Sequence, residues 1–444
     1  MAFRPAARAS RAPLLAPGVR PREVLAWAMY DFANSGYTTV VITAVFNAYF
    51  VAVVAGAAPW ATLLWTATLA VSYAAVMLTA PLIGAYADRH ANKKRLLAAS
   101  TVGCVACTAG LALAAPGEIA LACAFVVLSN FFFSTGENLI AAFLPELARG
   151  KALGKVSGWG WGLGYVGGLV SLGASLAYVT FAEARGATAA EFVPVTMLIT
   201  AGLFMAASLP TLLVLEERAE PQPAAGRGLF AEAFGRVLDT VRHAARYRDL
   251  ARFLACLVFY QAGVQAVVAL AAIYAEQAMG FTTRDSIVLI LAVNVTAALG
   301  AIAFGQVQDR LGHVPTIALT LTGWIATVAL AWWATDRATF WIAANLAGLC
   351  LGASQSAGRA LVGYLSPRDR RAEFFGLWGL AVKLSSILGP LTYGLANWLA
   401  GGDHRRAILL TGAYFVVGLM ILAGVDPRRG RRAALQAVRA SAAP

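Results

Sequence analysis

Four ionisable side chains interrupt long apolar stretches of the sequence: Asp31, Glu137, Arg359 and Lys383. Near the centre of a bilayer each would cost about 2.5–3.5 kcal/mol, so each needs a partner or a water-filled cavity. In one interpretation, Arg359 or Lys383 holds a carboxylate of a solute while Asp31 or Glu137 receives an ammonium group or a proton. In the other, acids and bases form ion pairs that close one side of the protein. The expected position of Lys383, near the midplane, favours contact with solute.

Neutral polar residues accompany these charges at helical spacing. Asn34 follows Asp31 by three positions, and Gln355 precedes Arg359 by four. Gln261 and Gln265 form another pair four residues apart. Residues three or four apart share one face of a helix. We therefore predict a polar substrate or proton cavity whose candidates are Asp31, Asn34, Glu137, Gln261, Gln265, Gln355, Arg359 and Lys383.

The composition places these residues in a membrane protein. Of the 444 residues, 59% are hydrophobic and only 13% are charged, whereas soluble proteins average roughly a quarter charged residues. The apolar runs are continuous, which disfavours a β-barrel with alternating polarity. We expect an all-α polytopic membrane protein with twelve transmembrane helices, at about 24–52, 62–87, 96–115, 119–144, 156–181, 193–215, 251–277, 286–306, 314–334, 339–364, 374–399 and 405–425.

The distribution of basic residues predicts the orientation. The net charge is +13, and most of the 35 Lys and Arg fall in the tails and in alternate loops. This is the positive-inside pattern, so nucleic acid is not needed to explain the charge. We expect a multi-pass protein of the bacterial inner membrane, surrounded by lipid, with both termini in the cytoplasm and a monomeric state.

An internal repeat divides the chain. Gly84, Asp88 and Arg89 close the second span, and Gly305, Asp309 and Arg310 close the eighth, 221 residues later. The expected organisation is therefore two pseudo-symmetric six-helix halves. Its parts are a cytoplasmic N-tail (1–23), an N-terminal half (24–215), a cytoplasmic linker with an amphipathic helix (216–250), a C-terminal half (251–425) and a cytoplasmic C-tail (426–444).

The repeated segment resembles the signature loop of the major facilitator superfamily. The first copy has Ala91 where a glycine is usual, whereas the second keeps Gly312. The resemblance implies that helices 1, 4, 7 and 10 surround a central cavity. It also implies that the residues of the two copies form a conformational latch: Gly84, Asp88, Arg89, Asp309 and Arg310.

Further motifs resemble a narrower branch, the vacuole-effluxer-like transporters related to the autophagy-related amino-acid exporter. They include Trp27-Ala-Met-Tyr30-Asp31 and the glycine-rich stretch from Ser157 to Gly168 with Trp159 and Trp161. The glycines have spacings that let helices approach closely. The tryptophans either line the cavity or face lipid.

The function predicted from these features is secondary transport by alternating access, with amino acids as the leading solute class, efflux as the direction and the proton as a candidate coupling ion. An exporter of amphipathic compounds or drugs is the alternative within transport. A non-enzymatic receptor or scaffold on a transporter fold is a further alternative. A membrane enzyme is disfavoured because no histidine box or Gly-x-Ser-x-Gly motif is present. No metal, catalytic residue or cofactor is expected.

Overall fold

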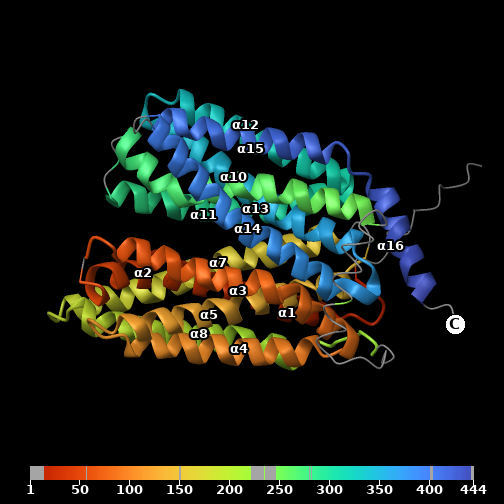
Figure 1. Cartoon of the computed structure of the whole chain (residues 1–444), viewed down its shortest axis with the longest axis horizontal. Helices are drawn as coiled ribbons and strands as arrows, with labels where there is room; N and C mark the ends of the chain where they lie inside the picture. Colours follow the sequence, from red (N-terminus) through yellow and green to blue (C-terminus); the bar gives the residue numbers. More distant parts are fainter. Residues whose placement is uncertain are drawn as a thin grey trace, which may run out of the picture.

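The computed structural model describes residues 15–56, 58–149, 152–221, 235, 247–279, 281, 283–400 and 404–441. Long helices run side by side along one axis (Figure 1). The N-terminal group consists of α1 (Pro21–Tyr37) with its continuation, α3 (Ala61–His90), α4 (Lys93–Gly110), α5 (Ile119–Ala141), α7 (Ala152–Glu183) and α8 (Ala189–Val214). The C-terminal group consists of α10 (Arg248–Met279), α11 (Thr283–Leu311), α12 (His313–Trp333), α13 (Arg337–Leu365), α14 (Arg371–Leu399) and α15 (His404–Leu422).

The helices suit a bilayer because only helices and closed barrels satisfy all backbone hydrogen bonds in lipid. In the described part of the chain, 11 helical segments are long and apolar enough to cross a membrane. The 29-residue helix α13 is not one of them, since it carries Asn345, Gln355 and Arg359. It packs between α11 and α12 and takes the place of the predicted span 339–364. The all-α fold in two six-helix halves is confirmed.

The two groups of helices form separate halves of the molecule (Figure 1), α1–α8 below and α10–α15 above. One end, on the right of Figure 1, includes the start of α1, the end of α3 and the short helix α16 (Pro427–Ser441). We call it the basic end because basic side chains gather there, including Arg89, Lys93, Arg149, Arg218, Arg310, Arg371 and Arg429.

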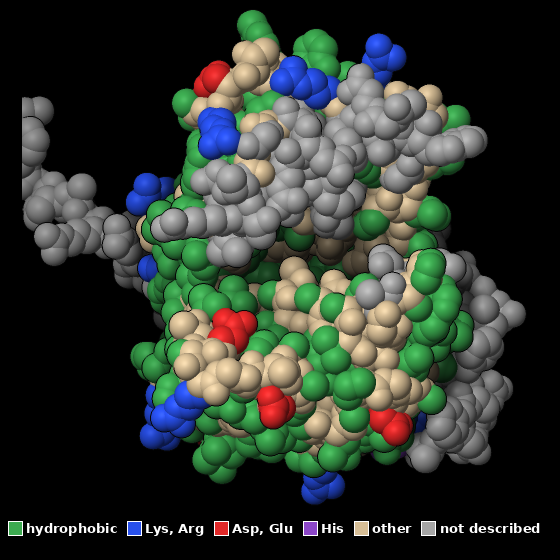
Figure 2. Space-filling view, turned by 90° about the vertical axis from the view of Figure 1, so that its left-hand side faces the viewer, with side chains coloured by type: hydrophobic (Ala, Val, Ile, Leu, Met, Phe, Trp, Pro, Cys, Tyr) green, Lys and Arg blue, Asp and Glu red, His purple; other side chains and the backbone are tan. Residues whose placement is uncertain are grey.

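The halves approach each other closely at the basic end. A Cβ atom added to Gly84 would collide with the backbone of Ala372, and one added to Gly305 would meet the backbone of Gly154. Only glycine allows helix backbones to pack this tightly. Seen from the opposite end, the surface is hollowed between the halves (Figure 2). The structure is therefore closed at the basic end and open at the other.

The first span changes its helical geometry halfway. It runs from Pro21 to Val54, but α1 gives way to the π-helix η1 (Thr38–Ala44), the short α2 (Phe46–Tyr49) and a second π-helix, η2 (Phe50–Val54). The Thr38 hydroxyl donates to the Asn34 carbonyl (3.0 Å), and the Thr43 hydroxyl donates to the Thr38 carbonyl (3.0 Å). Such bonds to backbone carbonyls bend helices, and π turns often mark functional sites.

The predicted linker helix and the predicted C-tail differ in what the structure describes of them. The predicted amphipathic helix of the 216–250 linker lies outside the described residues. The predicted C-tail, in contrast, contains the helix α16. Its Gly430, Ala434 and Ala437 are buried, while Arg428 and Arg432 are exposed. This amphipathic helix packs on α10 and α13, so the tail is a fixed part of the C-terminal half.

Candidate functional site

The Asp31 and Arg359 side chains form an ion pair between the halves. The Arg359 Nη1 atom lies 2.7 Å from Asp31 Oδ2, and this ion pair connects α13 to α1. The Asp31 side chain is 11% exposed and the Arg359 side chain 3%. Arg359 also donates through Nε to Ser157 Oγ (3.1 Å) and through Nη2 to the Ser157 carbonyl (3.0 Å). Ser157 belongs to α7, so the guanidinium binds two helices of the opposite half.

Two tryptophans enclose the guanidinium. The Arg359 Cζ atom lies 4.7 Å from the ring centroid of Trp27 and 5.3 Å from that of Trp161. Both distances suit cation–π attraction. Trp161 therefore faces the charges between the halves, one of the two positions that its sequence context allowed, whereas Trp159 is 36% exposed.

Gly160 makes room for this arrangement. A Cβ atom at Gly160 would meet the Asp31 carboxylate, the Arg359 guanidinium and the Trp27 ring. The glycine-rich pattern of α7 thus has a local purpose beyond general helix packing, because any larger residue here would displace the ion pair.

Glu137 and Lys383 form a looser ion pair between α5 and α14. The Lys383 Nζ to Glu137 Oε2 distance is 3.6 Å, and the side chains are 10% and 24% exposed for Lys383 and Glu137. The Lys383 ammonium also lies 5.3 Å from the Tyr73 ring centroid and 5.6 Å from that of Phe133. Asp31 and Glu137 of the N-terminal half are therefore each paired with a base of the C-terminal half.

Neutral polar residues accompany the charges on α1, α5 and α13, and further ones lie on α10. Gln261 and Gln355 exchange hydrogen bonds of 2.7 and 3.3 Å within the C-terminal half, and Gln265 lies one turn further along α10, half-buried. Several buried polar atoms have no hydrogen-bond partner within the described residues: Asn34 Oδ1, Ser134 Oγ, Asn138 Nδ2 and Tyr260 OH. Buried polar atoms normally bind a partner, so these atoms favour water or solute between the halves.

The repeated Asp-Arg segments make equivalent contacts across the halves. Asp88 Oδ2 accepts from the Glu373 backbone N–H at the start of α14 (2.9 Å). Asp309 Oδ1 accepts from the Lys155 backbone N–H at the start of α7 (3.3 Å). A carboxylate at a helix N-terminus gains up to about 2 kcal/mol. Both contacts join the two halves at the basic end.

The two copies differ in burial and in strain. Asp88 and Arg89 are buried, whereas Asp309 is half-buried and Arg310 is exposed. The turn after the first copy places Ala91 at φ 46°, in the left-handed region, which costs a non-glycine residue about 1–2 kcal/mol. Gly312 adopts φ 97° in the second copy, so both turns have the backbone shape that favours glycine.

Sequence reasoning missed a charge network beneath the N-terminal half. Lys93, which follows the first Asp-Arg segment in the sequence, forms a buried ion pair with Glu146. Glu217 accepts from the backbone N–H groups of Lys93 (2.8 Å) and Lys94 (3.0 Å), at the N-terminus of α4. Arg218 pairs with Glu23 at 2.8 Å. The run of acids at 216–217 was the available signal.

A second missed contact anchors α16. Arg429 donates to both carboxylate oxygens of Asp249 at 2.8 and 2.6 Å. The hydrogen bonds and charge of Asp249 raise the pKa of the Arg429 guanidinium above its usual value.

No group of three or more metal-ligating side chains occurs within the described ranges. The two ion pairs between the halves, Asp31–Arg359 and Glu137–Lys383, suit gating and solute binding.

Solved structures with the same fold are transporters. The human organic anion transporter MFSD10 superposes with a TM-score of 0.71 at 16% identity, covering 91% of this chain and all of that one. The Escherichia coli fucose:proton symporter FucP gives a TM-score of 0.70 at 12% identity, covering 91% of this chain and 98% of that one. At these identities the similarity shows the fold.

Comparisons with known sequences identify the family to which the chain belongs. The chain is 27% identical over 414 residues to the uncharacterized MFS-type transporter YxiO of Bacillus subtilis, covering 90% of this chain and 94% of YxiO. Fold and sequence together define a multi-pass membrane protein, a non-enzymatic transporter of the major facilitator superfamily. Residues 61–435 match the family described as Vacuole effluxer Atg22 like, and the chain belongs to that family. Autophagy-related protein 22 of Kluyveromyces lactis is 26% identical over 211 residues, which cover 45% of this chain and 42% of that protein.

Proposed function

We propose that the chain is a secondary transporter that exports a small polar solute by alternating access, with amino acids as the leading solute class. The observation that carries the proposal is the pairing of Asp31 with Arg359 and of Glu137 with Lys383 across the halves. A transporter that rocks its halves about a central site must break and remake such contacts in each cycle.

The pairs supply both parts of the proposed chemistry. When the basic end opens, Arg359 and Lys383 lose their carboxylate partners and become free to hold the carboxylate of a solute. Asp31 and Glu137 then become able to receive an ammonium group or a proton, so proton coupling would use one of these acids. Asp88 and Asp309 serve as latches that release the basic end in the same step.

The basic end faces the cytoplasm in this proposal. The concentration of Lys and Arg there matches the positive-inside pattern, which supports a cytoplasmic position for both termini and the linker in a bacterial cell. The structure then corresponds to the outward-open state. The proposed unit is a monomer, since each cavity candidate belongs to this one chain.

A second candidate, export of amphipathic compounds, is favoured by a largely apolar cavity lined mainly by helices of the C-terminal half. Flux measurements on reconstituted vesicles test both candidates. Vesicles containing the full chain should accumulate a labelled amino acid by counterflow, and the Arg359→Gln variant should not. Ser386→Ala, a half-buried change on α14, is the control. Absence of flux for both amino acids and amphipathic compounds would indicate a receptor or scaffold instead.

A further inference from the structure

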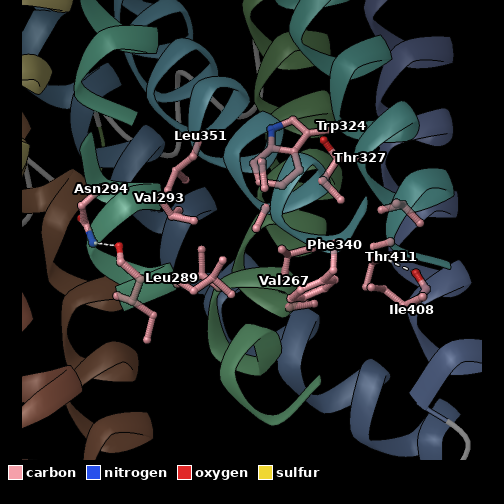
Figure 3. A pocket seen from close by; sticks show the side chains of 18 of the residues that line it. Val267, Leu289, Val293, Asn294, Trp324, Thr327, Phe340, Leu351, Ile408 and Thr411 are labelled. Atoms are coloured by element: carbon pink, nitrogen blue, oxygen red, sulfur yellow. Dashed lines mark hydrogen bonds between the residues drawn. The ribbon is translucent and has the colours of Figure 1, made fainter. Parts of the chain in front are cut away.

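A cavity of about 340 Å³ opens in the half of the bundle away from the basic end. Helices α10, α11, α12, α13 and α15 supply most of its wall, and Thr38, Thr43 and Tyr165 of the N-terminal half complete it. Figure 3 shows the Trp324, Phe340 and Leu351 side chains directed around the same space. The cavity therefore belongs mainly to the C-terminal half.

The cavity is large enough for an occupant bigger than a single aromatic ring. An apolar cavity of about 150 Å³ is enough to bind benzene, and pockets for drug-sized ligands begin at about 300 Å³. The wall is largely apolar, with aromatic side chains of Trp324, Phe340 and Tyr393. A body of about two fused aromatic rings matches this space.

The charge of the wall restricts the occupant further. The described lining residues include no Asp, Glu, Lys or Arg. A carboxylate or ammonium group would lose its hydration here without a charged partner, which is expensive. The cavity thus favours an uncharged molecule.

Three polar groups in the C-terminal part of the wall already donate a hydrogen bond within the protein. The Thr327 hydroxyl already donates to the Gly323 carbonyl (2.9 Å), and the Thr411 hydroxyl donates to the Ile408 carbonyl. The Asn294 amide donates to the Ile290 carbonyl (2.9 Å). Each group keeps oxygen lone pairs that can accept a hydrogen bond. An occupant with a hydroxyl or amide N–H donor therefore suits the wall.

The cavity is separate from the ion pair but connected to it. Tyr165 lines the cavity, and its ring centroid lies 6.0 Å from that of Trp161. Trp161 in turn covers the Arg359 guanidinium at 5.3 Å. An occupant can thus influence the ion pair through two aromatic rings without contacting the charges.

We propose that this cavity binds an uncharged amphipathic compound with a bicyclic-sized apolar body and one hydrogen-bond donor. This inference rests on the proposed transport function and gives its second candidate, an amphipathic solute, a defined chemistry: uncharged, with one hydrogen-bond donor. The Tyr165–Trp161 contact links its binding to the Asp31–Arg359 gate.

Equilibrium binding to the full chain in lipid nanodiscs tests the proposal. The probes share one ring system: 2-naphthol has a donor, 2-methoxynaphthalene has none, and 2-naphthoate is an anion. We expect 2-naphthol to bind most tightly and 2-naphthoate most weakly at pH 7. Equal or tighter binding of 2-naphthoate would overturn the proposal, as would failure of 2-naphthol to bind.

Variants locate the binding. Ala347→Leu fills space in the cavity wall and should weaken 2-naphthol binding at least tenfold, whereas Ala338→Leu, exposed on the same helix, should not change it. The double variant Thr327→Val with Thr411→Val removes two of the three acceptors with little change in shape. It should weaken 2-naphthol binding about 2- to 10-fold and leave 2-methoxynaphthalene binding unchanged. Unchanged 2-naphthol binding in both variants would contradict the site.

Vesicle flux separates this inference from the proposed function. Binding that depends on Ala347 without flux of any compound would refute transport and support the site. Amino-acid flux in the wild type, without 2-naphthol binding, would support transport and refute the site.

Discussion

Neutralising Arg359 should be the most costly single change among the charges between the halves. The Asp31 carboxylate would remain at 11% exposure without the base that lies 2.7 Å away. Removing one partner of a buried ion pair costs about 3–5 kcal/mol. Asp31→Asn should cost less than Arg359→Gln, because Arg359 keeps its two hydrogen bonds to Ser157 and its contacts with two tryptophan rings.

A double-mutant cycle isolates the energy of this pair. The free energies of unfolding of Asp31→Asn, Arg359→Gln and the double variant, measured in mixed micelles, should give a coupling of about 2–3 kcal/mol. The pair of Glu137 and Lys383 is the matched control. At 3.6 Å and with Glu137 24% exposed, its coupling should stay below about 1 kcal/mol. Equal couplings for the two pairs, or one below about 0.5 kcal/mol for Asp31 and Arg359, would refute the reasoning.

Three further changes have defined outcomes. Gly160→Ala should slow transport as strongly as Asp31→Asn, because its Cβ would displace the ion pair; wild-type flux would contradict this. Ala91→Gly should raise the free energy of unfolding by about 1 kcal/mol by relieving the left-handed alanine, and an unchanged or lower value in a denaturation assay would show that the turn is unstrained. Asp88→Asn should insert and fold normally but slow turnover, since it weakens the contact with the Glu373 N–H. Unaltered turnover would leave the loop with only a topological role.

The charges and the repeat could be predicted because both are visible as patterns along the sequence. Asp31 and Arg359 stand out as ions within apolar stretches, and Asp88 and Asp309 recur at half the chain length. The division into halves then follows from counting spans. Which helices face the centre was implied by the resemblance to the major facilitator superfamily.

The partner of each charge could not be read from the linear pattern. The depth of Lys383 favoured contact with solute. Its 3.6 Å distance from Glu137 could not be predicted, because it depends on how α14 crosses α5. Gly160 likewise fitted general packing until its neighbours from other helices were known.

Features that require several helices were also beyond sequence reasoning. The cavity around Trp324 and Phe340 needs residues from both halves, and no spacing along one helix indicates it. The helix α16 was not predicted because its many arginines are typical of a solvated tail. In the structure, Gly430 and Ala434 form a buried face of this helix.

Ion pairs between the halves should hold the basic end closed while the other end is open. Distances between spin labels measure this directly in a cysteine-free background. Labels at Arg95 and Arg368 report on the basic end, and labels at Glu118 and Thr335 report on the opposite end; all four positions are exposed.

In lipid nanodiscs, Arg359→Gln should lengthen the first distance and shorten the second, relative to the same labels without that substitution. Removing about 3 kcal/mol from the closed state changes the ratio of the two states by roughly a hundredfold. Identical distance distributions with and without Arg359→Gln, or distances that change in the same direction at both ends, would contradict the account.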